Sequence, residues 1–424
     1  MIDFSAPEAI QQQTQFMQMV ASSMLRPISR EYDERESEHA KPMELFNQMW
    51  ETLKGQNLAA YERNRKRTAE ADKSKDDGKP RRPITASMTL IHTIEALAWG
   101  DVGLYLSIPG SGLGGAAVEA AGTPEQKERF LKRFTEGEPK WGAMAITEPG
   151  AGSDTSAIKT RAVHDRVTNE WVLNGEKIFC TSGWMAGEQS KGFVVVWATV
   201  DPSAGRAGIK SFIVEAGTPG FKVAKLEKKL GIRASDTATL VLQDCRIPFD
   251  NILGSPEVAE RQTTEGYKGV LMTFDATRPA VAASAIGVAR AALELLKEEL
   301  AKQGIVIHYD KPRHQLTAVE RDVLECEAQL KAAWLLTQRA AWMNDNRVPN
   351  SLEASMCKVR AGMAGVYITQ KAVEWLGPLG YSRKLLAEKL FRDSKIAELY
   401  EGTRQINLLI IARRILGYSS RQLR

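Results

Sequence analysis

The sequence has few cysteines and no long hydrophobic run. Its 424 residues include four cysteines, none of which belongs to a C-x-x-C pair. This pattern argues against a zinc ribbon and against a secreted disulfide scaffold, so we expect a reducing compartment. No run of about 18 consecutive apolar residues occurs, so we expect no membrane span.

An excess of charge of one sign is also missing. The 57 basic and 52 acidic side chains leave a net charge of only +5, which is weak support for a polyanionic partner. The first sixteen residues contain two acids and no Lys or Arg, unlike a signal or transit peptide. Since 43% of the residues are hydrophobic, the chain can bury a real core. We expect a soluble cytoplasmic protein with no nucleic-acid partner.

Residues 1–140 show the spacing of helices. Apolar side chains recur three and four residues apart in Glu44–Leu53, Thr85–Trp99 and Pro124–Thr135, which is the helical period. In the last segment Thr123 precedes Pro124, a typical N-cap followed by proline in the first turn. The sequence therefore predicts an N-terminal helical domain.

Residues 141–255 differ in texture, with short β-rich runs between turn residues. Asn174-Gly175 separates Trp171–Leu173 from Lys177–Thr181, a spacing that predicts a β-hairpin. Further strands are expected at Gly192–Val200, Ile209–Glu215 and Ala238–Leu242. The sequence therefore predicts a compact antiparallel β domain.

Residues 256–424 are helical again. The long periodic stretches are Val270–Leu300, Leu316–Asn346, Leu352–Leu376 and Ala387–Leu416. Long helices joined by short loops predict an antiparallel bundle. The expected fold is α+β and multidomain, with a helical domain, a β domain and a four-helix bundle in chain order.

The segment 62–82 stands apart because it has nine basic residues, five acidic residues and almost nothing apolar. Such a segment cannot bury itself, so we expect an exposed loop or a partly disordered insertion. Its interleaved acids argue against a role in nucleic-acid binding.

Two segments of the β region have features of a cofactor site. The loop Thr147–Asp154, TEPGAGSD, combines glycines with hydroxyls, and its backbone N–H groups could face an anion. Phe179 and Thr181 lie two apart in a strand, so they share a face on which a planar cofactor could stack. Taken alone, the loop is equally well a connector, and an aromatic in a strand is more often part of the core.

Two segments of the helical region have candidate catalytic or binding groups. Asp275 and Arg278 lie three apart in FDATRP, a spacing that by itself favours a surface ion pair. Glu401 precedes Gly402 at a break between helices. A carboxylate there could point into a cleft, where burial would raise its pKa towards that of a working base. Without further context it would be a solvated Glu near a helix end.

In combination and order, these motifs resemble the acyl-CoA dehydrogenase family. The matching segments between Glu95 and Leu416 read TEPGAGSD, KIFCTSG, KLGIRASDT, RIPFDNILG, FDATRPAVAASAIG and RDSKIAELYEGTRQI. The succession of helical, β and helical-bundle regions agrees with the three domains of that family. Six ordered segments with family-like spacing make chance agreement very improbable.

The resemblance implies FAD as cofactor and an acyl-CoA thioester as substrate. The residues it places at FAD are Met144, Ile146, Thr147, Gly152, Ser153, Phe179, Thr181, His314, Gln315, Glu374, Gly377, Thr403 and Gln405. Those it places at the substrate are Ser153, Asp275, Thr277, Arg278 and Gly402. No metal is implied.

The resemblance also implies the reaction. Glu401 would remove the α-proton while the β-hydrogen leaves as hydride to flavin N5, giving a trans-2-enoyl-CoA. The thioester oxygen would be stabilised by the backbone N–H of the base and by a ribityl hydroxyl of the flavin. Some family members have the base in the FDATR segment instead. Thr277 occupies that position here and cannot act as a base, which leaves Glu401.

Three departures from the family pattern affect the expected FAD and acyl sites. Gly304 stands where many members have an Arg, Glu374 replaces a Gln, and Pro378 replaces a Gly. A lost cation and an added carboxylate near a pyrophosphate each weaken FAD binding, by on the order of 1 kcal/mol if partly buried. The charged segment 62–82 occupies a region where members often have a Gly-rich loop. We expect either local compensation, by Lys302 or Arg313, or fewer than one FAD per subunit.

The resemblance further implies a homotetramer and electron-transferring flavoprotein as the electron acceptor. Two alternatives remain open: a subunit of a heteromeric acyl-CoA dehydrogenase with a shared FAD site, and an acyl-CoA oxidase that uses O2. The acyl chain is not readable from the sequence. Trp99, Trp334 and Trp342 are expected in the core.

Overall fold

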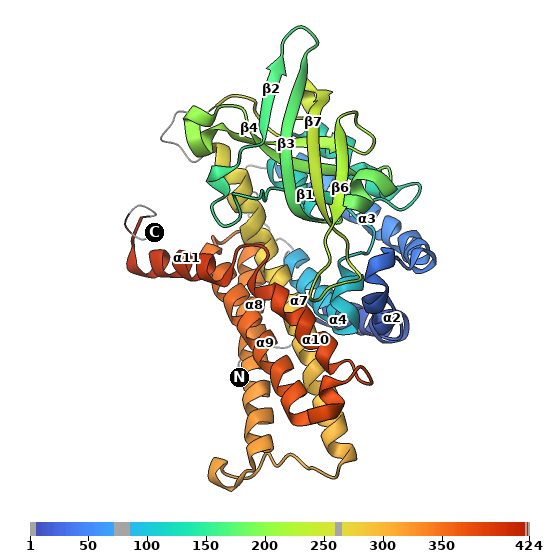
Figure 1. Cartoon of the computed structure of the whole chain (residues 1–424). Coiled ribbons are helices and arrows are strands. Elements are labelled where there is room, and N and C mark those ends of the chain that lie inside the picture. Colours follow the sequence, from blue (N-terminus) through green and yellow to red (C-terminus); the bar gives the residue numbers. More distant parts are fainter. Residues whose placement is uncertain (1–5, 72–84, 259–264, 420–421, 423–424) are drawn as a thin grey trace.

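The α-helical and β parts of the molecule occupy different regions of space. The computed structural model describes residues 6–71, 85–258, 265–419 and 422. In Figure 1 the sheet lies at one end and the long helices α7 (Glu265–Lys302), α8 (Ala318–Asp345) and α9 (Ser351–Tyr381) run away from it. The N-terminal helices lie beside the junction of these two parts. This arrangement confirms the α+β fold class with N-terminal helices, a central sheet and C-terminal helices.

The N-terminal region is helical, as its periodicity predicts. Its helices are α1 (Glu8–Val20), α2 (Ser29–Glu34), α3 (Met43–Ala71), α4 (Ala86–Tyr105), α5 (Gly112–Ala121) and α6 (Pro124–Leu131). Thr123 caps α6 in a capping box with Gln126, as the Thr-Pro signal indicates. The prediction of a loop at 62–82 is wrong for residues 62–71, which continue α3. Residues 72–82 lie outside the described ranges.

The β region forms one seven-stranded sheet. Its strands are β1 (Gly142–Ala145), β2 (Arg161–Asp165), β3 (Glu170–Thr181), β4 (Phe193–Thr199), β5 (Ile209–Glu215), β6 (Phe221–Leu226) and β7 (Thr237–Pro248). The order is β1-β4-β2-β3-β7-β6, with β5 paired to β4. β4 pairs in parallel with β1 and β2, and the other pairings are antiparallel. The sheet is therefore mixed rather than purely antiparallel.

The predicted hairpin turn at Asn174-Gly175 is wrong. β3 runs straight through both residues, and its hairpin partner is β2, which lies before it in the chain. The pairing of β3 with β7 shifts register between Leu173 and Gly175. A Cβ at Gly175 would lie 2.4 Å from the Thr160 hydroxyl oxygen. The glycine is needed for this close approach at an irregularity of the strand, not for a reversal of the chain.

Strand β4 shows that the sheet is covered on both faces. All seven of its residues, FVVVWAT, are buried. Alternate side chains of a strand point to opposite faces. Val194 and Val196 pack with Trp141 in one cluster, and Val195 packs with Phe130 in another. The sheet therefore lies between two apolar layers, which explains the continuous hydrophobic run of this strand.

The C-terminal helices pack through small residues such as Ala282, Ala289 and Ala361. The FDATRP segment lies within α7, with Pro279 inside the helix. Within the described residues, the α7 segment Phe274–Lys302 is long and apolar enough to cross a membrane, but 72% of its most hydrophobic window is buried inside the protein. Its apolar character is that of a core helix.

The periodic stretch 387–416 is broken into two helices, α10 (Ala387–Ser394) and α11 (Arg404–Leu416). The expectation that Glu401 lies at a break between helices is therefore correct. Among the three tryptophans expected in the core, Trp99 and Trp334 are half-buried against the bundle. Trp342 is 54% exposed, so that expectation is wrong.

Candidate functional site

The segment that leads to Glu401 is held by a buried ionic cluster at the start of α10. The ammonium of Lys389 lies 2.6 Å from a carboxylate oxygen of Asp101 and 2.6 Å from one of Asp393, and all three side chains are at most 2% exposed. Asp101 belongs to α4, where the backbone leaves helical geometry. Asp393 also accepts a hydrogen bond of 2.6 Å from the backbone N–H of Ile232 in the β6–β7 loop. The cluster therefore joins α4, α10 and the β domain.

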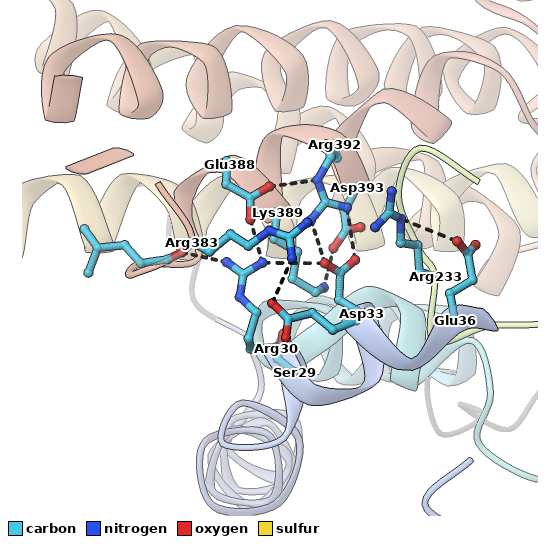
Figure 2. A network of polar contacts seen from close by, with 12 residues as sticks. Ser29, Arg30, Asp33, Glu36, Arg233, Arg383, Glu388, Lys389, Arg392 and Asp393 are labelled. Atoms are coloured by element: carbon cyan, nitrogen blue, oxygen red, sulfur yellow. Dashed lines mark hydrogen bonds and ion pairs between the residues drawn. The ribbon is translucent and has the colours of Figure 1, made fainter. Parts of the chain in front are cut away.

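A second set of ion pairs fixes the N-terminal helix α2 on α10 (Figure 2). The Arg392 guanidinium lies 2.6 Å from Asp33, and Arg30 lies 2.5 Å from Glu388. Arg392 also donates to the backbone oxygen of Leu230 at 2.9 Å. Segments more than 350 residues apart in the chain thus meet at the element that precedes Glu401.

Glu401 lies in a turn with left-handed backbone geometry. Its φ is 55°, and Gly402 follows with a φ of 88°. Thr403 then caps α11 by accepting a hydrogen bond from the backbone N–H of Ile406. The Gly402 carbonyl accepts from the Asn407 amide at 2.9 Å and also from the ammonium of Lys358. A non-glycine residue with positive φ is strained and persists where surrounding contacts determine it.

The Glu401 carboxyl faces a hydroxyl on the neighbouring helix α7. One of its oxygens accepts a hydrogen bond of 2.9 Å from Thr277. The side chain is partly exposed, yet enough protein surrounds the carboxyl that burial raises its pKa. The hydrogen bond from Thr277 and the charges of Arg278 and Lys358 act in the opposite direction. Burial is the largest of these influences, and it favours a carboxyl that can accept a proton near neutral pH.

Asp275 and Arg278 form an ion pair of 2.7 Å, but it is not the exposed pair that the spacing alone favours. The Arg278 side chain is 5% exposed, and its Nε atom has no hydrogen-bond partner among the described residues. Burial lowers the pKa of this guanidinium and raises the pKa of Asp275. A buried donor without a partner is costly, so this Arg is suited to bind an acceptor from outside the chain.

The predicted flavin residues of the β region come together where the end of β3 lies against β1 and the loop that follows it. The backbone N–H of Ile178 donates to the Thr147 carbonyl at 2.9 Å, and the Cys180 thiol donates to the Met144 carbonyl. Phe179 lies between these two contacts, has a φ of 58°, and is 59% exposed. An aromatic so exposed beside a buried strand is available to stack on a planar molecule.

The loop 147–154 is supported from below by Glu148. Its carboxylate lies 2.7 Å from the ammonium of Lys177 and accepts hydrogen bonds from the Thr160 backbone and hydroxyl. Gly152 and Ser153 remain exposed, and a Cβ built at Gly152 would meet no atom within 4 Å. The loop therefore has a rigid base and an open outer surface. Sequence reasoning assigned no role to Glu148.

Phe274 connects the flavin residues to the Glu401 group. It lies directly before Asp275 on α7 and packs against the cluster that contains Met144 and Ile146. The predicted residues of the β region and of α7 thus lie at one junction between the sheet and the helices.

The other predicted cofactor residues do not all join this site. His314 and Gln315 are exposed in a short turn before α8, and Glu374 lies near the far end of α9. Sixteen residues of α9 separate Glu374 from Lys358, which is about 24 Å at 1.5 Å per residue. Gly377 has a φ of 53° at the kink there, with Pro378 next to it. Within one chain, these residues form a separate distal group.

The distal group is neutralised locally. The Glu374 carboxylate lies 2.8 Å from the Lys371 ammonium and accepts from Gln370 at 2.7 Å. Lys302 is engaged by Glu299 at 2.6 Å. The added carboxylate is therefore paired with Lys371, which the sequence analysis did not name, and not with Lys302. Thr403 lies beside Glu401, and Gln405 is exposed on α11.

Two surface cavities lie away from the predicted site. One, of about 600 Å³, is lined by residues such as Arg133, Lys191 and Glu215. The other, of about 400 Å³, lies between α4, α7 and α8 and includes His92 and Trp334. Neither contains a predicted site residue, so the chemistry is assigned from side-chain geometry and not from cavity size.

Lys358 and Tyr400 are the neighbours of Glu401 that the sequence analysis missed. The Tyr400 hydroxyl lies 3.2 Å from that of Ser284, and burial raises the pKa of Tyr400 to about 12. Burial lowers the pKa of Lys358 to about 8. A signal for Lys358 existed, because a lone lysine stands among small residues in SMCKVRAGMAG. Such a lysine on a packed helix face must be buried with a partner.

Two family models match most of the region just described. The acyl-CoA dehydrogenase middle domain matches residues 143–245, and the acyl-CoA dehydrogenase C-terminal domain matches residues 264–416. These two ranges contain every residue that the resemblance assigned to FAD or substrate.

Known proteins similar to this chain agree with those models. An acryloyl-CoA reductase (NADH) of Anaerotignum propionicum is 38% identical over 300 residues, which are 71% of this chain and 72% of that protein. The mitochondrial short-chain specific acyl-CoA dehydrogenase of Bos taurus is 39% identical over 295 residues, or 70% of this chain and 67% of that protein. The structure of butyryl-CoA dehydrogenase from Megasphaera elsdenii superposes with a TM-score of 0.80 at 31% identity, covering 98% of this chain and 100% of that one.

Proposed function

Because the chain belongs to the acyl-CoA dehydrogenase family, an oxidoreductase family acting on CH–CH donors, we propose that it converts an acyl-CoA thioester to the trans-2-enoyl-CoA with Glu401 as the base. One observation supports this most directly. Glu401 is held in a left-handed turn with its carboxyl against Thr277, and burial raises its pKa. This is the environment that an enzyme needs to make a carboxylate basic.

The chain supplies the base and one donor for the reaction. The Glu401 carboxylate takes the α-proton, which is acidic only while negative charge on the thioester oxygen is stabilised. The backbone N–H of Glu401 donates to no group among the described residues, so it is available for that oxygen. This N–H and the carboxyl belong to the same residue. The left-handed turn therefore favours a fixed position of the N–H relative to the carboxyl.

The end of β3 and the loop after β1 fit a planar flavin, and we propose FAD as the cofactor. FAD, when bound, supplies the acceptor for the β-hydride. The exposed ring of Phe179 would stack on it, with Thr181 two residues further on at the end of β3. The open outer surface of the loop at Gly152 and Ser153 would accept its phosphates through backbone N–H groups. Phe179 and Gly152 meet this requirement without rearrangement, since both already face open space.

We propose further that electrons pass to electron-transferring flavoprotein, that the chain assembles as a homotetramer, and that it works in the cytoplasm. The first two rest on the family resemblance. The last is supported by the four cysteines, which are all free and buried. An oxidase that passes electrons to O2 is the alternative for the acceptor. Anaerobic reduction followed by mixing with air separates the two, because a dehydrogenase reoxidises slowly with O2 and an oxidase rapidly.

A heteromeric dehydrogenase with a shared FAD site is the second candidate. It is favoured by the distal group, where Gly304 provides no cation and Lys371 is occupied by Glu374 and by Asp322 at 3.2 Å. In this reading, the distal group does not hold a phosphate of a neighbouring subunit's FAD. A partner chain with the missing cation would then complete half of the sites.

The test is anaerobic bleaching of the flavin absorbance with a panel of acyl-CoAs. Short straight chains come first, because two of the similar proteins are named for them. We expect one substrate class to bleach the wild-type protein. Glu401→Gln should keep its flavin and lose bleaching rate by about two to four orders of magnitude, since the amide of Gln cannot take the α-proton. Bleaching at the wild-type rate in this variant would overturn the assignment of the base.

A further inference from the structure

Lys358 is a buried cation directly beneath the turn that presents Glu401. It lies on α9 and is 1% exposed. Its ammonium donates to the carbonyl of Gly402, the residue after the proposed base. Among the described residues, no carboxylate lies within ion-pair distance of it. A buried ammonium whose one described partner is a neutral carbonyl is costly to desolvate.

Charged groups from three elements face Lys358. Glu401 comes from the turn before α11, Arg278 from α7, and Glu398 from the short helix that follows α10. Burial lowers the pKa of Lys358 to about 8, and the two carboxylates oppose this effect while Arg278 adds to it. Lys358 therefore keeps its charge in the acidic and neutral range.

The hydrogen bond alone does not explain why a lysine stands here. Asn407, fully buried, already donates to the Gly402 carbonyl at 2.9 Å and to the Thr403 carbonyl at 3.0 Å. A neutral amide thus holds the turn from the α11 side. The second donor brings a positive charge into a site where burial opposes the ionised form of Glu401. Only that charge distinguishes Lys358 from Asn407 as a support of the turn.

We propose that Lys358 is a positioning residue for the proposed base, in which its ammonium holds the Gly402 carbonyl and its charge keeps the Glu401 carboxylate ionised at neutral pH. This inference rests on the proposed function, because it assumes that Glu401 removes a proton. It adds the requirement of a positive charge near the Glu401 carboxyl, which neither the turn geometry nor the hydroxyl of Thr277 supplies. Arg278 is the other nearby cation, but its guanidinium is paired with Asp275, whereas Lys358 has no carboxylate partner.

The sign of the effect follows from electrostatics. A positive charge near a carboxyl favours the ionised form and lowers its pKa, typically by about one to three pH units for groups within about 4–6 Å. Removing the charge leaves burial less opposed, so the pKa of Glu401 rises. Proton abstraction needs the ionised form, so the acid limb of the pH–rate profile moves to higher pH.

The experiment measures the anaerobic bleaching rate from pH 5 to 9 for the wild type, Lys358→Met and Lys358→Arg. We expect the acid limb of Lys358→Met to move up by about one pH unit or more, so that its rate at the acidic end falls at least about tenfold. Lys358→Arg keeps the charge and should keep the limb near its wild-type position. Flavin content and thermal melting of each variant establish that it folds.

Lys41→Met is the matched control. Lys41 is also buried, donates to a backbone carbonyl, that of Ala234, at 2.5 Å, and has a pKa lowered by burial to about 8. It differs in lying near Asp236 instead of Glu401. This variant should lower the melting temperature and leave the acid limb in place, which separates loss of a buried lysine from loss of charge at the base.

The outcomes distinguish this inference from the proposed function. If the wild type bleaches and Lys358→Met keeps its acid limb, Lys358 is a structural residue and the inference is wrong. If Lys358→Met and Lys358→Arg move the acid limb equally, the effect does not come from charge, and the inference is again wrong. If no acyl-CoA bleaches the wild type, the proposed function itself fails before Lys358 is tested.

Discussion

Opposing influences meet at the carboxyl of Glu401. Burial raises its pKa, while Thr277, Arg278 and Lys358 lower it. Without the other motifs, the local sequence would favour a solvated Glu near a helix end at Glu401 and a surface ion pair at Arg278. The structure decides both cases, because side chains from α7 and α9 reach the turn. Neither helix is adjacent to Glu401 in the chain, so local spacing could not have supplied this information.

Replacing Thr277 with Val should shift the pH dependence of the reaction. The hydrogen bond of 2.9 Å stabilises the ionised form of Glu401, so its loss raises the pKa of this carboxyl. The acid limb of the bleaching rate should move to higher pH by about one unit. At pH values well above the limb, the rate should stay close to that of the wild type. Thr277→Ser, which keeps the hydroxyl, should restore the profile, and an unshifted limb in Thr277→Val would show that this hydrogen bond is unimportant.

At the scale of elements, the position of α10 is set by ion pairs and not by its own sequence. Lys389 lies between Asp101 and Asp393 with almost no exposure, and these two carboxylates raise the pKa of Lys389. Through Ile232, the same cluster contacts the β domain. The turn at Glu401 therefore starts from a helix whose position is determined by three separate parts of the chain.

Lys389→Met should strongly destabilise the protein. It leaves Asp101 and Asp393 buried without a counter-charge, and breaking a buried ion pair costs about 3–5 kcal/mol. Lys395→Met is the matched control six residues later, because Lys395 is 47% exposed in its pair with Glu398 and such pairs contribute at most about 1 kcal/mol. Chemical denaturation followed by far-UV circular dichroism measures both. Equal losses in the two variants would contradict the importance of the buried cluster.

Several helices and strands begin where the periodicity of the sequence predicts them. The prediction was wrong at Asn174-Gly175, where two backbone segments approach closely. Strand β5 and the capped helix α6 begin where they were predicted. Asn174-Gly175 looked like a turn, but its Gly is required by the approach of Thr160. Pro279 is of a residue type that usually ends a helix, yet it lies buried inside α7. In both places a residue that usually ends an element lies within one, which spacing alone does not reveal.

At the scale of the whole molecule, the predicted cofactor residues divide into two groups. Met144 and Ile146 lie in the cluster on which Phe274 of α7 packs, whereas Glu374 and Gly377 lie near the far end of α9. A single chain therefore brings only the first group to the proposed base. The second can act only on a molecule bound at the other end of the bundle.

Flavin absorbance per chain distinguishes the two proposed assemblies. A homomeric enzyme should contain about one FAD per chain, because each site needs only the junction group and whatever an identical chain adds. A heteromeric enzyme with shared sites should contain about one FAD for every two chains. Sedimentation of the purified protein, alone and in the presence of co-expressed relatives, supports the count. A value near one would exclude shared sites, and a value near one half would exclude the homomeric arrangement.

The sequence by itself determined the family, the α+β fold class and the residue proposed as base, because each depends on local motifs and on the period of apolar residues. It could not determine the environment of Glu401, the burial of Arg278 or the contribution of Lys358. These depend on side chains that are distant in the chain and meet only when α7, α9 and the turn before α11 pack together. The pKa of a carboxyl is set by its surroundings in three dimensions, so only the tertiary structure decided it.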